Sequence, residues 1–254
     1  MTSGAAGSRG GGAGSRFPPT QHSIVAALAA VDPEVRAPAF EALVASYWRP
    51  AYRYLMAARG LSHEDAEDLT QEFFARAFSK DTLASYDPAK ARFRTFVRVC
   101  LDRVALNAFK ANQRLKRGGG QRAVSLDSDG ASEAIASSLP LPAVDPEAYF
   151  RREWIRSLFD GALADTTAEC RARGKDIPLA IFLAYDIDPP ADSGRPSYAE
   201  LATRHGLPIT QITNHLALVR KIFRRAVLDR LKAVTASAEE YAAEAREILG
   251  VEVG

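Results

Sequence analysis

Apolar side chains recur every three or four residues through two long stretches of this 254-residue chain, from about residue 22 to 116 and from residue 146 onward. Several segments repeat them at i, i+4, i+7 and i+11, which places them on one face of a helix. No run of residues shows the period-two alternation of a β-strand. The chain is therefore predicted to be all-α, with two small helical domains joined by a flexible linker, the second containing a helix-turn-helix.

Composition divides the chain into five stretches. The first sixteen residues are rich in glycine and hold no large apolar side chain, so residues 1–21 are predicted to be a disordered tail. Residues 22–117 are the first helical domain, 118–145 a linker rich in Gly, Ser, Pro and Ala, and 146–234 the second helical domain, with Pro146 in its first helical turn. Residues 235–254 are an acidic tail, which either covers the basic helix of the second domain or is solvated; the solvated state is favoured.

Three helices are expected in the first domain. Pro50 is expected to kink or divide the first of them, within residues 40–60. The second begins after Ser62 and the third near Arg92. The expected buried faces are Ala66, Leu69, Phe73 and Ala77 in the second helix, and Phe93, Val97, Cys100 and Val104 in the third.

The same composition excludes several classes of protein. Two cysteines cannot form a disulfide scaffold, and four scattered histidines give no metal-ligand spacing. The longest uncharged apolar run, residues 24–31, is far shorter than a membrane helix, and the N-terminus has no apolar signal core. We therefore expect a cytoplasmic protein with no cofactor, no metal and no membrane partner. The formal net charge of +2 is an average over strongly acidic and strongly basic stretches.

The segment from Ser197 to Lys232 has the pattern of a helix-turn-helix. Ser197 and Glu200 form a capping box, and Gly206 supplies the left-handed residue of a tight turn before a second helix. That helix has an apolar face, a face able to reach base edges, and a basic end able to meet phosphates. The residues expected to face DNA are Gln211, Thr213, Asn214, His215 and Leu218 for bases, and Arg220, Lys221, Arg224 and Arg225 for phosphates. The alternative is an ordinary helical hairpin with a solvated basic face.

Residues 92–122 carry nine basic side chains and one acidic side chain, Asp102. Basic side chains interleaved with aromatic ones suit a nucleic-acid strand whose backbone is gripped while its bases stack. The alternative is that Phe93 lies in the core and the arginines form a solvated face. One helical stripe contains Arg103, Asn107, Lys110 and Arg114, and the interleaved aromatic residues are Phe93, Phe96 and Phe109.

Acidic residues dominate the segment just before this one. Residues 62–72 contain five Asp or Glu and no Lys or Arg. The helix dipole explains acids in the first turn, but Asp68 and Glu72 lie beyond it. With Asp65 they form a stripe that is expected to face a basic protein partner. No histidine or pocket pattern supports a metal or acid-catalysis role for these carboxylates.

Three segments together resemble the extracytoplasmic-function sigma factors of bacterial RNA polymerase: residues 65–78 (DAEDLTQEFFARAF), residues 93–120 (from FRTF to KRGGG) and residues 197–216 (SYAELATRHGLPITQITNHL). Their order and spacing match regions two and four of that family, joined without a region three. The resemblance implies a non-enzymatic protein that binds the largest and flap-bearing subunits of core RNA polymerase, recognises the −35 and −10 promoter elements and promotes DNA opening. It leaves open whether an anti-sigma factor exists.

The resemblance also implies roles for individual residues. The acidic helix docks on the largest polymerase subunit through Asp65, Asp68, Gln71 and Glu72. The basic helix melts and reads the −10 element through Arg94, Phe96, Arg98, Arg103, Asn107, Lys110 and Arg114. The helix-turn-helix reads the −35 element through Gln211, Thr213, Asn214, His215, Leu218, Arg220, Lys221 and Arg224. This sequence departs from the family at Phe96, where tryptophan is common, at Pro208, where a Ser or Thr cap is common, and across residues 215–218, where basic residues are common.

Two other functions fit parts of the pattern. A stand-alone regulator of the LuxR-like kind would use the second helix of the helix-turn-helix for recognition and the first domain as a sensor or dimerisation unit. The basic helix and the acidic stripe argue against it, because a sensor needs neither. A promoter-inactive adaptor would keep the fold and lose promoter binding. Binding to core polymerase tests the first alternative, and promoter opening tests the second.

Overall fold

The computed structural model describes residues 24–77, 85–116, 145–189 and 194–252. The predicted N-terminal tail at 1–21 and residues 118–144 of the predicted linker lie outside the described residues, as do the side chains of Ala77 and residues 112–116. Every regular element in the described part is a helix, which confirms the all-α prediction. No helix in this part is long and apolar enough to cross a membrane.

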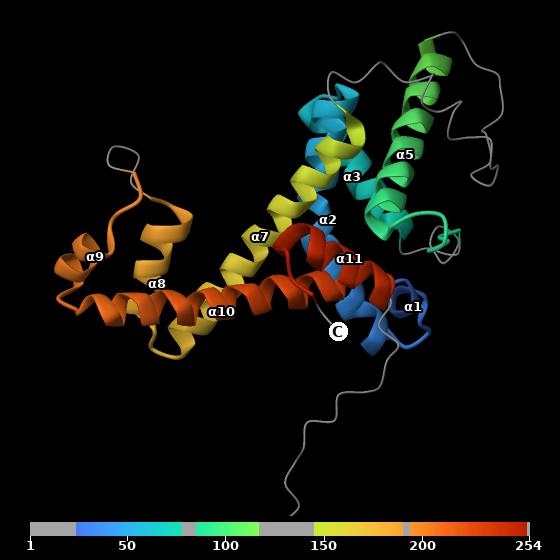
Figure 1. Ribbon diagram of the computed structural model, residues 1–254. Helices are drawn as coiled ribbons and strands as arrows, with labels where there is room; N and C mark the ends of the chain where they lie inside the picture. The colour runs from blue at the N-terminus through green and yellow to red at the C-terminus, as the bar shows by residue number, and fades with distance from the viewer. Residues whose placement is uncertain (1–23, 78–84, 117–144, 190–193, 253–254) are drawn as a thin grey trace, which may run out of the picture.

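The first half of the chain forms helices α1 (Ile24–Ala29), α2 (Pro33–Arg59), α3 (His63–Ala77) and α5 (Phe93–Lys116) (Figure 1). Pro50 lies inside α2 and does not divide it, so of the two expected effects of this proline, a kink or a division, the division is absent. The buried face of α2 continues past the proline through Tyr47, Ala51 and Tyr54. Because helix stability in proteins comes mostly from packing of such a face, it holds the turns on both sides of Pro50.

Helices α3 and α5 begin and pack as the sequence predicts. The Ser62 hydroxyl accepts a hydrogen bond from the backbone N–H of Asp65 (3.1 Å), which supports the first turn of α3. The described part of the predicted buried faces is confirmed in both helices: Ala66, Leu69 and Phe73 in α3, and Phe93, Val97, Cys100 and Val104 in α5.

The second half forms α7 (Pro146–Ala172), α8 (Asp176–Phe182), the π-helix η1 (Leu183–Ile187), α9 (Tyr198–His205), α10 (Ile209–Ala233) and α11 (Ala238–Leu249). Pro146 lies in the first turn of α7, as predicted, and the Asp145 side chain caps this helix. The capping box of Ser197 and Glu200 is present at α9, and Gly206 ends α9 with φ of 63°. These local predictions succeed because each depends on neighbours within four residues.

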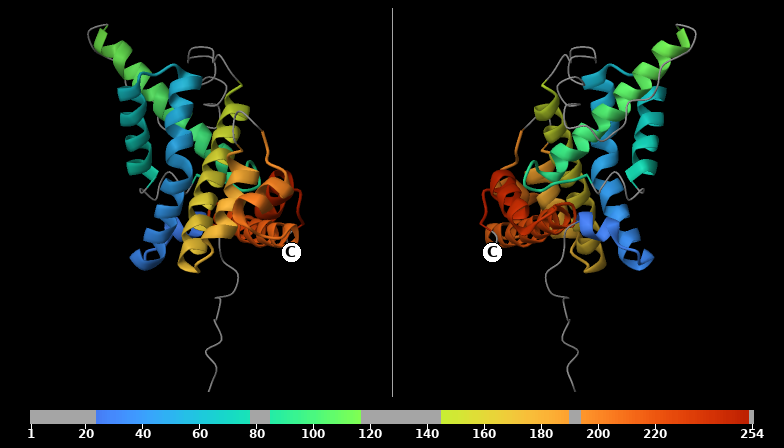
Figure 2. Two further views of the ribbon diagram at one scale, coloured as in Figure 1. Left: turned by 90° about the vertical axis from the view of Figure 1, so that its left-hand side faces the viewer. Right: turned by 90° about the vertical axis from the view of Figure 1, so that its right-hand side faces the viewer.

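The two predicted domains share one hydrophobic core, so the boundary expected between them is not a boundary in packing. Tyr47 of α2 stacks on Phe150 and Trp154 of α7, with ring centroids 6.4 and 6.2 Å apart. The same buried cluster includes residues of α1, α3, α5, α10 and α11. Helices α2 and α7 lie side by side in both views of Figure 2. Helical spacing identifies a buried face but not the helix that covers it.

A smaller cluster lies at the other end of α7 and α10. It is formed by α8, α9, Cys170 of α7 and the first half of α10, where Ile212, Leu216 and Val219 are fully buried. Helix α10 runs from this cluster back to the larger core, where Val227 and Leu231 are buried (Figure 1). One continuous helix therefore connects the α9–α10 turn to the core that holds α2 and α5.

The acidic tail is not solvated, which corrects the favoured expectation. Residues 238–249 form α11, capped by Ser237, and Glu244 and Ala245 are fully buried. Helix α11 covers the start of α5, whereas the sequence analysis considered only the basic helix of the second domain as a helix that this tail could cover. The physical reason is a set of ion pairs between segments about 150 residues apart in the chain, described below.

Candidate nucleic-acid and protein interfaces

Helix α3 presents its acidic side chains to solvent. Asp65, Asp68 and Gln71 are exposed, while Leu69 and Phe73 on the opposite face are buried. The Ser62 hydroxyl donates a hydrogen bond to the Asp65 carboxylate (2.7 Å) and holds it at the helix start. Glu72 is half-buried and forms an ion pair with Arg76 one turn further on. The structure thus places Asp65, Asp68 and Gln71 on one open surface, suited to basic partner side chains.

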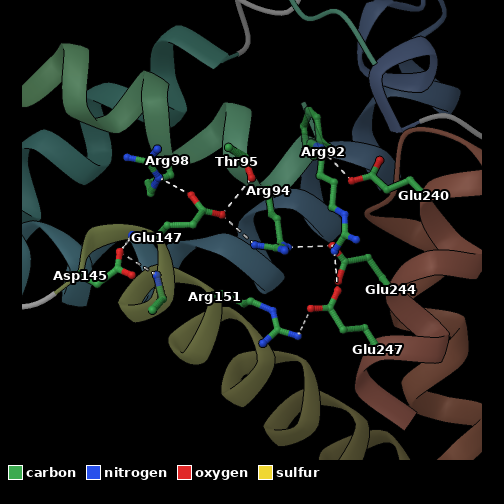
Figure 3. A network of polar contacts seen from close by, with 12 residues as sticks. Arg92, Arg94, Thr95, Arg98, Asp145, Glu147, Arg151, Glu240, Glu244 and Glu247 are labelled. Atoms are coloured by element: carbon green, nitrogen blue, oxygen red, sulfur yellow. Dashed lines mark hydrogen bonds and ion pairs between the residues drawn. The ribbon is translucent and has the colours of Figure 1, made fainter. Parts of the chain in front are cut away.

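The basic start of α5 is enclosed by carboxylates from α7 and α11 (Figure 3). Arg94 donates from Nε to Glu244 Oε1 (2.7 Å) and from Nη1 to Glu147 Oε1 (2.9 Å). Arg98 donates from Nε to the other oxygen of Glu147 (2.7 Å). Arg92 donates to Glu244 (3.0 Å) and to Glu247 (2.6 Å). Each of these arginines is therefore already bound to a carboxylate.

Glu240 supplies a second kind of contact at the same place. Its Oε1 accepts from the backbone N–H of Phe93 (2.7 Å), and its Oε2 accepts from the N–H of Ala236 (2.8 Å). Burial raises the pKa of Glu240 despite these bonds. In contrast, the hydrogen bond from Arg92 lowers the pKa of Glu247. A carboxylate at the first N–H groups of α5 is favourable because those donors have no partner within the helix.

One turn further along α5, Asp102 is the centre of a buried network. Its Oδ1 accepts from the Tyr54 hydroxyl (2.6 Å) and from Arg59 Nε (2.8 Å), and its Oδ2 accepts from Arg98 Nη1 (2.8 Å). Asp102 and Arg59 are both buried. Burial raises the pKa of Tyr54, and the neighbouring Asp102 carboxylate raises it further. The only acid of the basic segment is thus a structural partner of α2.

These contacts change the interpretation of the predicted −10 residues. Arg94 is 6% exposed, and the Arg98 side chain is 18% exposed, so neither presents an open guanidinium group to a ligand in this conformation. Phe96 is half-buried and its ring lies 5.1 Å from that of Tyr86. Arg94 and Arg98 are closed off because they bind acidic residues of α7 and α11, which the sequence analysis placed in the second domain and the acidic tail.

The remaining predicted −10 residues lie further along the same helix. Arg103, Asn107 and Lys110 are half-buried, and the side chain of Arg114 lies outside the described residues. Phe109, which the sequence analysis also singled out, is 38% exposed. This stretch of α5, from its third to its fifth turn, thus differs from the first two turns, where the carboxylates of α7 and α11 lie.

The first half of α10 carries the predicted −35 residues. His215 is half-buried, and the others are exposed: Gln211, Thr213, Asn214, Leu218, Arg220, Lys221 and Arg224. Arg220 is bound to Asp186 of η1, donating from Nε (2.8 Å) and Nη2 (3.0 Å), and Arg225 forms an ion pair with Glu169 of α7. The structure therefore brings the predicted base-contacting residues to one exposed stretch and engages two of the predicted phosphate contacts within the protein.

The residues that sequence reasoning missed are the acidic partners of α5. The sequence analysis treated the segment that holds Glu147 only as the start of a helix. It treated the segment that holds Glu240, Glu244 and Glu247 only as an acidic tail. A usable signal was present, because residues 92–122 are strongly basic and residues 239–252 strongly acidic. Opposite net charges on two segments favour their pairing, although they do not specify which residues meet.

Residues 43–115 match the family model of sigma-70 region 2, a stretch that contains most of α2, all of α3 and nearly all of α5. No curated protein and no solved structure matches the chain. The region 2 match supports a sigma factor of the sigma-70 family, and it includes the acidic face of α3 and the basic helix α5 but not α7 to α11.

Proposed function

We propose that this protein is a sigma factor that binds core RNA polymerase, directs it to promoter DNA and promotes opening of the duplex. The observation that carries the proposal is the match of residues 43–115 to sigma-70 region 2, with an exposed acidic face on α3 inside it. The protein itself performs no covalent chemistry in this function, since nucleotide addition belongs to the polymerase. The resemblance to the extracytoplasmic-function type is part of the proposal.

The polymerase contact is assigned to the exposed face of α3. Asp65, Asp68 and Gln71 lie on a helix whose other side packs against α2 and α5, so the face is rigidly supported. Exposed carboxylates on a rigid helix attract a basic partner and fix its orientation. Glu72 pairs with Arg76 in the free protein, and in this proposal it leaves Arg76 to bind a basic residue of the polymerase.

The DNA contacts are assigned to α5 and α10. Along α5, Arg103, Asn107 and Lys110 follow the half-buried Phe96, an arrangement suited to stacking and backbone contact with a separated strand. On α10, Gln211 and Asn214 carry amides that bind adenine in a bidentate manner. In this proposal α9 and α10 form the helix-turn-helix that reads the −35 element.

Core binding tests the proposal directly. Asp68→Lys reverses one exposed charge of α3, and we expect it to weaken binding to core RNA polymerase at least tenfold, about 1.4 kcal/mol, because like charges would then meet across the interface. The matched control is Asp229→Lys, the same change at an exposed position on α10. Affinity is measured by titrating fluorescently labelled protein with core enzyme, and circular dichroism checks that helix content is kept.

The outcomes separate the candidate functions. Loss of core binding in Asp68→Lys but not in Asp229→Lys supports the assignment of α3. If the parent protein does not bind core at all, the sigma function is wrong and a stand-alone regulator becomes the better interpretation. Run-off transcription on a promoter library then distinguishes a sigma factor from an adaptor that binds core without opening DNA.

A further inference from the structure

Four carboxylates from outside the region 2 segment close on the start of α5. We call them the acidic clamp: Glu147 of α7, and Glu240, Glu244 and Glu247 of α11. Figure 3 shows Glu147 reaching Arg94 and Arg98 from one side, while the residues of α11 reach Arg92, Arg94 and the start of α5 from the other. Arg151 of α7 also binds Glu247 (2.7 Å), so α7 and α11 are held together as well.

Helix α11 contacts the start of α5 through carboxylates, and its Tyr241, Ile248 and Leu249 pack against the larger core cluster. Its buried residues are Glu244 and Ala245 alone, and its larger apolar side chains are only partly buried. Glu244 is fully buried, and its Oε2 has no hydrogen-bond partner among the described residues. Removing such carboxylates from water opposes the attraction that they gain, so buried ion pairs contribute little net stability. Release of α11 is therefore much less costly than the number of ion pairs suggests.

The clamp occupies the groups that a nucleic acid would use. A guanidinium group binds a carboxylate and a phosphate through the same N–H donors. The backbone N–H of Phe93, at the start of α5, is a donor that favours an anion, and Glu240 fills that position. The donors of Arg92, Arg94 and Arg98 that bind the clamp are therefore not free for a phosphate backbone while the clamp is in place.

We propose that α11, together with Glu147, is an autoinhibitory element that covers the nucleic-acid-binding start of α5 and is displaced by the nucleic acid. The proposal rests on the proposed function for the role of α5. The displaced helix stays tethered, because only residues 234–237 separate α10 from α11. Exchange replaces carboxylates by phosphates on the arginines and returns Glu244 to water, which offsets part of the cost of releasing α11.

Charge removal within the full chain tests the proposal. Glu247→Gln removes a carboxylate that contacts Arg92 and Arg151 and is 40% exposed, so the fold is expected to tolerate it. Glu252→Gln is the matched control, because within the described part of the chain Glu252 pairs with Arg246, in the C-terminal segment itself. The probe is a fluorescein-labelled forked DNA of randomised sequence, followed by anisotropy. We expect Glu247→Gln to bind about two- to fivefold more tightly than the parent, and Glu252→Gln to bind equally to the parent.

Hydrogen exchange supplies a readout that a purely structural helix would not change. We expect the amides of residues 238–249 to exchange faster when the DNA probe is added, while those at the centre of α7 keep their protection. Glu244→Gln should increase both the affinity for DNA and the exchange rate of α11 amides in the presence of DNA. If Glu244→Gln does not fold because this residue is buried, Glu247→Gln alone tests the proposal. The proposal is overturned if α11 stays protected on bound DNA, or if Glu247→Gln and Glu252→Gln bind DNA equally.

Core binding by the same preparations separates this proposal from the proposed function. If DNA displaces α11 but the protein does not bind core RNA polymerase, the autoinhibitory element stands and the sigma function fails. If the protein binds core through Asp68 but DNA leaves α11 in place, the sigma function stands and the autoinhibitory element fails.

Discussion

Replacing Asp102 by alanine should lower the free energy of unfolding by several kcal/mol, about 3–5, because Asp102 is the acceptor at the centre of a buried network. Asp102→Ala removes the acceptor of three side chains, Tyr54, Arg59 and Arg98. Arg98 keeps a carboxylate partner in Glu147, but among the described residues Arg59 keeps only the neutral Tyr54 hydroxyl at 2.9 Å. The variant therefore leaves a buried guanidinium group without a counter-charge.

The size of the effect follows from burial. The side chains of Arg59 and Asp102 are 6% and 8% exposed, and breaking a buried ion pair from one side costs about 3–5 kcal/mol. Asp160→Ala is the control, because Asp160 and its partner Arg49 are about half exposed and such pairs contribute about 0–1 kcal/mol. With a slope of about 2.5 kcal/mol per molar urea, Asp102→Ala should lower the unfolding midpoint by about 1–2 M.

Removing the second charge sharpens the test. Replacing a buried ion pair by apolar residues of similar volume is often nearly neutral, so Asp102→Ala with Arg59→Met should be more stable than Asp102→Ala alone. Urea unfolding followed by circular dichroism measures both. The reasoning is refuted if Asp102→Ala costs no more than Asp160→Ala, or if the double variant is the least stable of the set.

Three further predictions concern single groups. Burial raises the pKa of Cys100 to about 12, and Cys170 is buried with its pKa also raised, so neither thiol should react with Ellman's reagent at pH 8 until the protein is unfolded. Gly206→Ala should cost about 1–2 kcal/mol in urea unfolding because of the φ of 63°, and Gly206→Asn should cost less, since asparagine tolerates that conformation. Arg92 lowers the pKa of Glu247, so the folded state binds fewer protons there than the unfolded chain. The stabilising contribution of Glu247 is then present above the unfolded pKa of about 4.3 and is lost as pH falls through the folded pKa. Glu247→Gln should therefore make the free energy of unfolding depend less on pH, measured by urea unfolding between pH 3 and 7.

The sequence predicted those parts of the fold that depend on near neighbours. The capping box at Ser197, the left-handed Gly206 and the buried face of α5 all follow from residues within a few turns of each other. The exposed side of α3 follows in the same way, because its buried residues fix where Asp65 and Asp68 point. These signals are local and require no knowledge of the rest of the chain.

The sequence did not predict which surfaces meet. The apolar stripe of α7 is visible from Phe150 and Trp154, but nothing local says that Tyr47 of α2 covers it. In the same way, an acidic tail and a basic helix are both visible, yet only the fold brings Glu244 to Arg94. Charge attraction acts between any two such segments, so the choice of partner is decided by the packing of the helices that carry them.

The small net charge of the chain reflects, in part, the pairing of basic and acidic segments at the start of α5. At the start of α5, the four guanidinium groups of Arg92, Arg94, Arg98 and Arg151 face the four carboxylates of the acidic clamp. In this state the local charge is balanced, and the start of α5 has little electrostatic attraction for DNA. Movement of α11 away from α5 would remove three of the four carboxylates from this surface and leave a positive patch. Because attraction to the phosphate backbone supplies most of the sequence-independent affinity for DNA, the position of one twelve-residue helix is sufficient to change how strongly this surface binds nucleic acid.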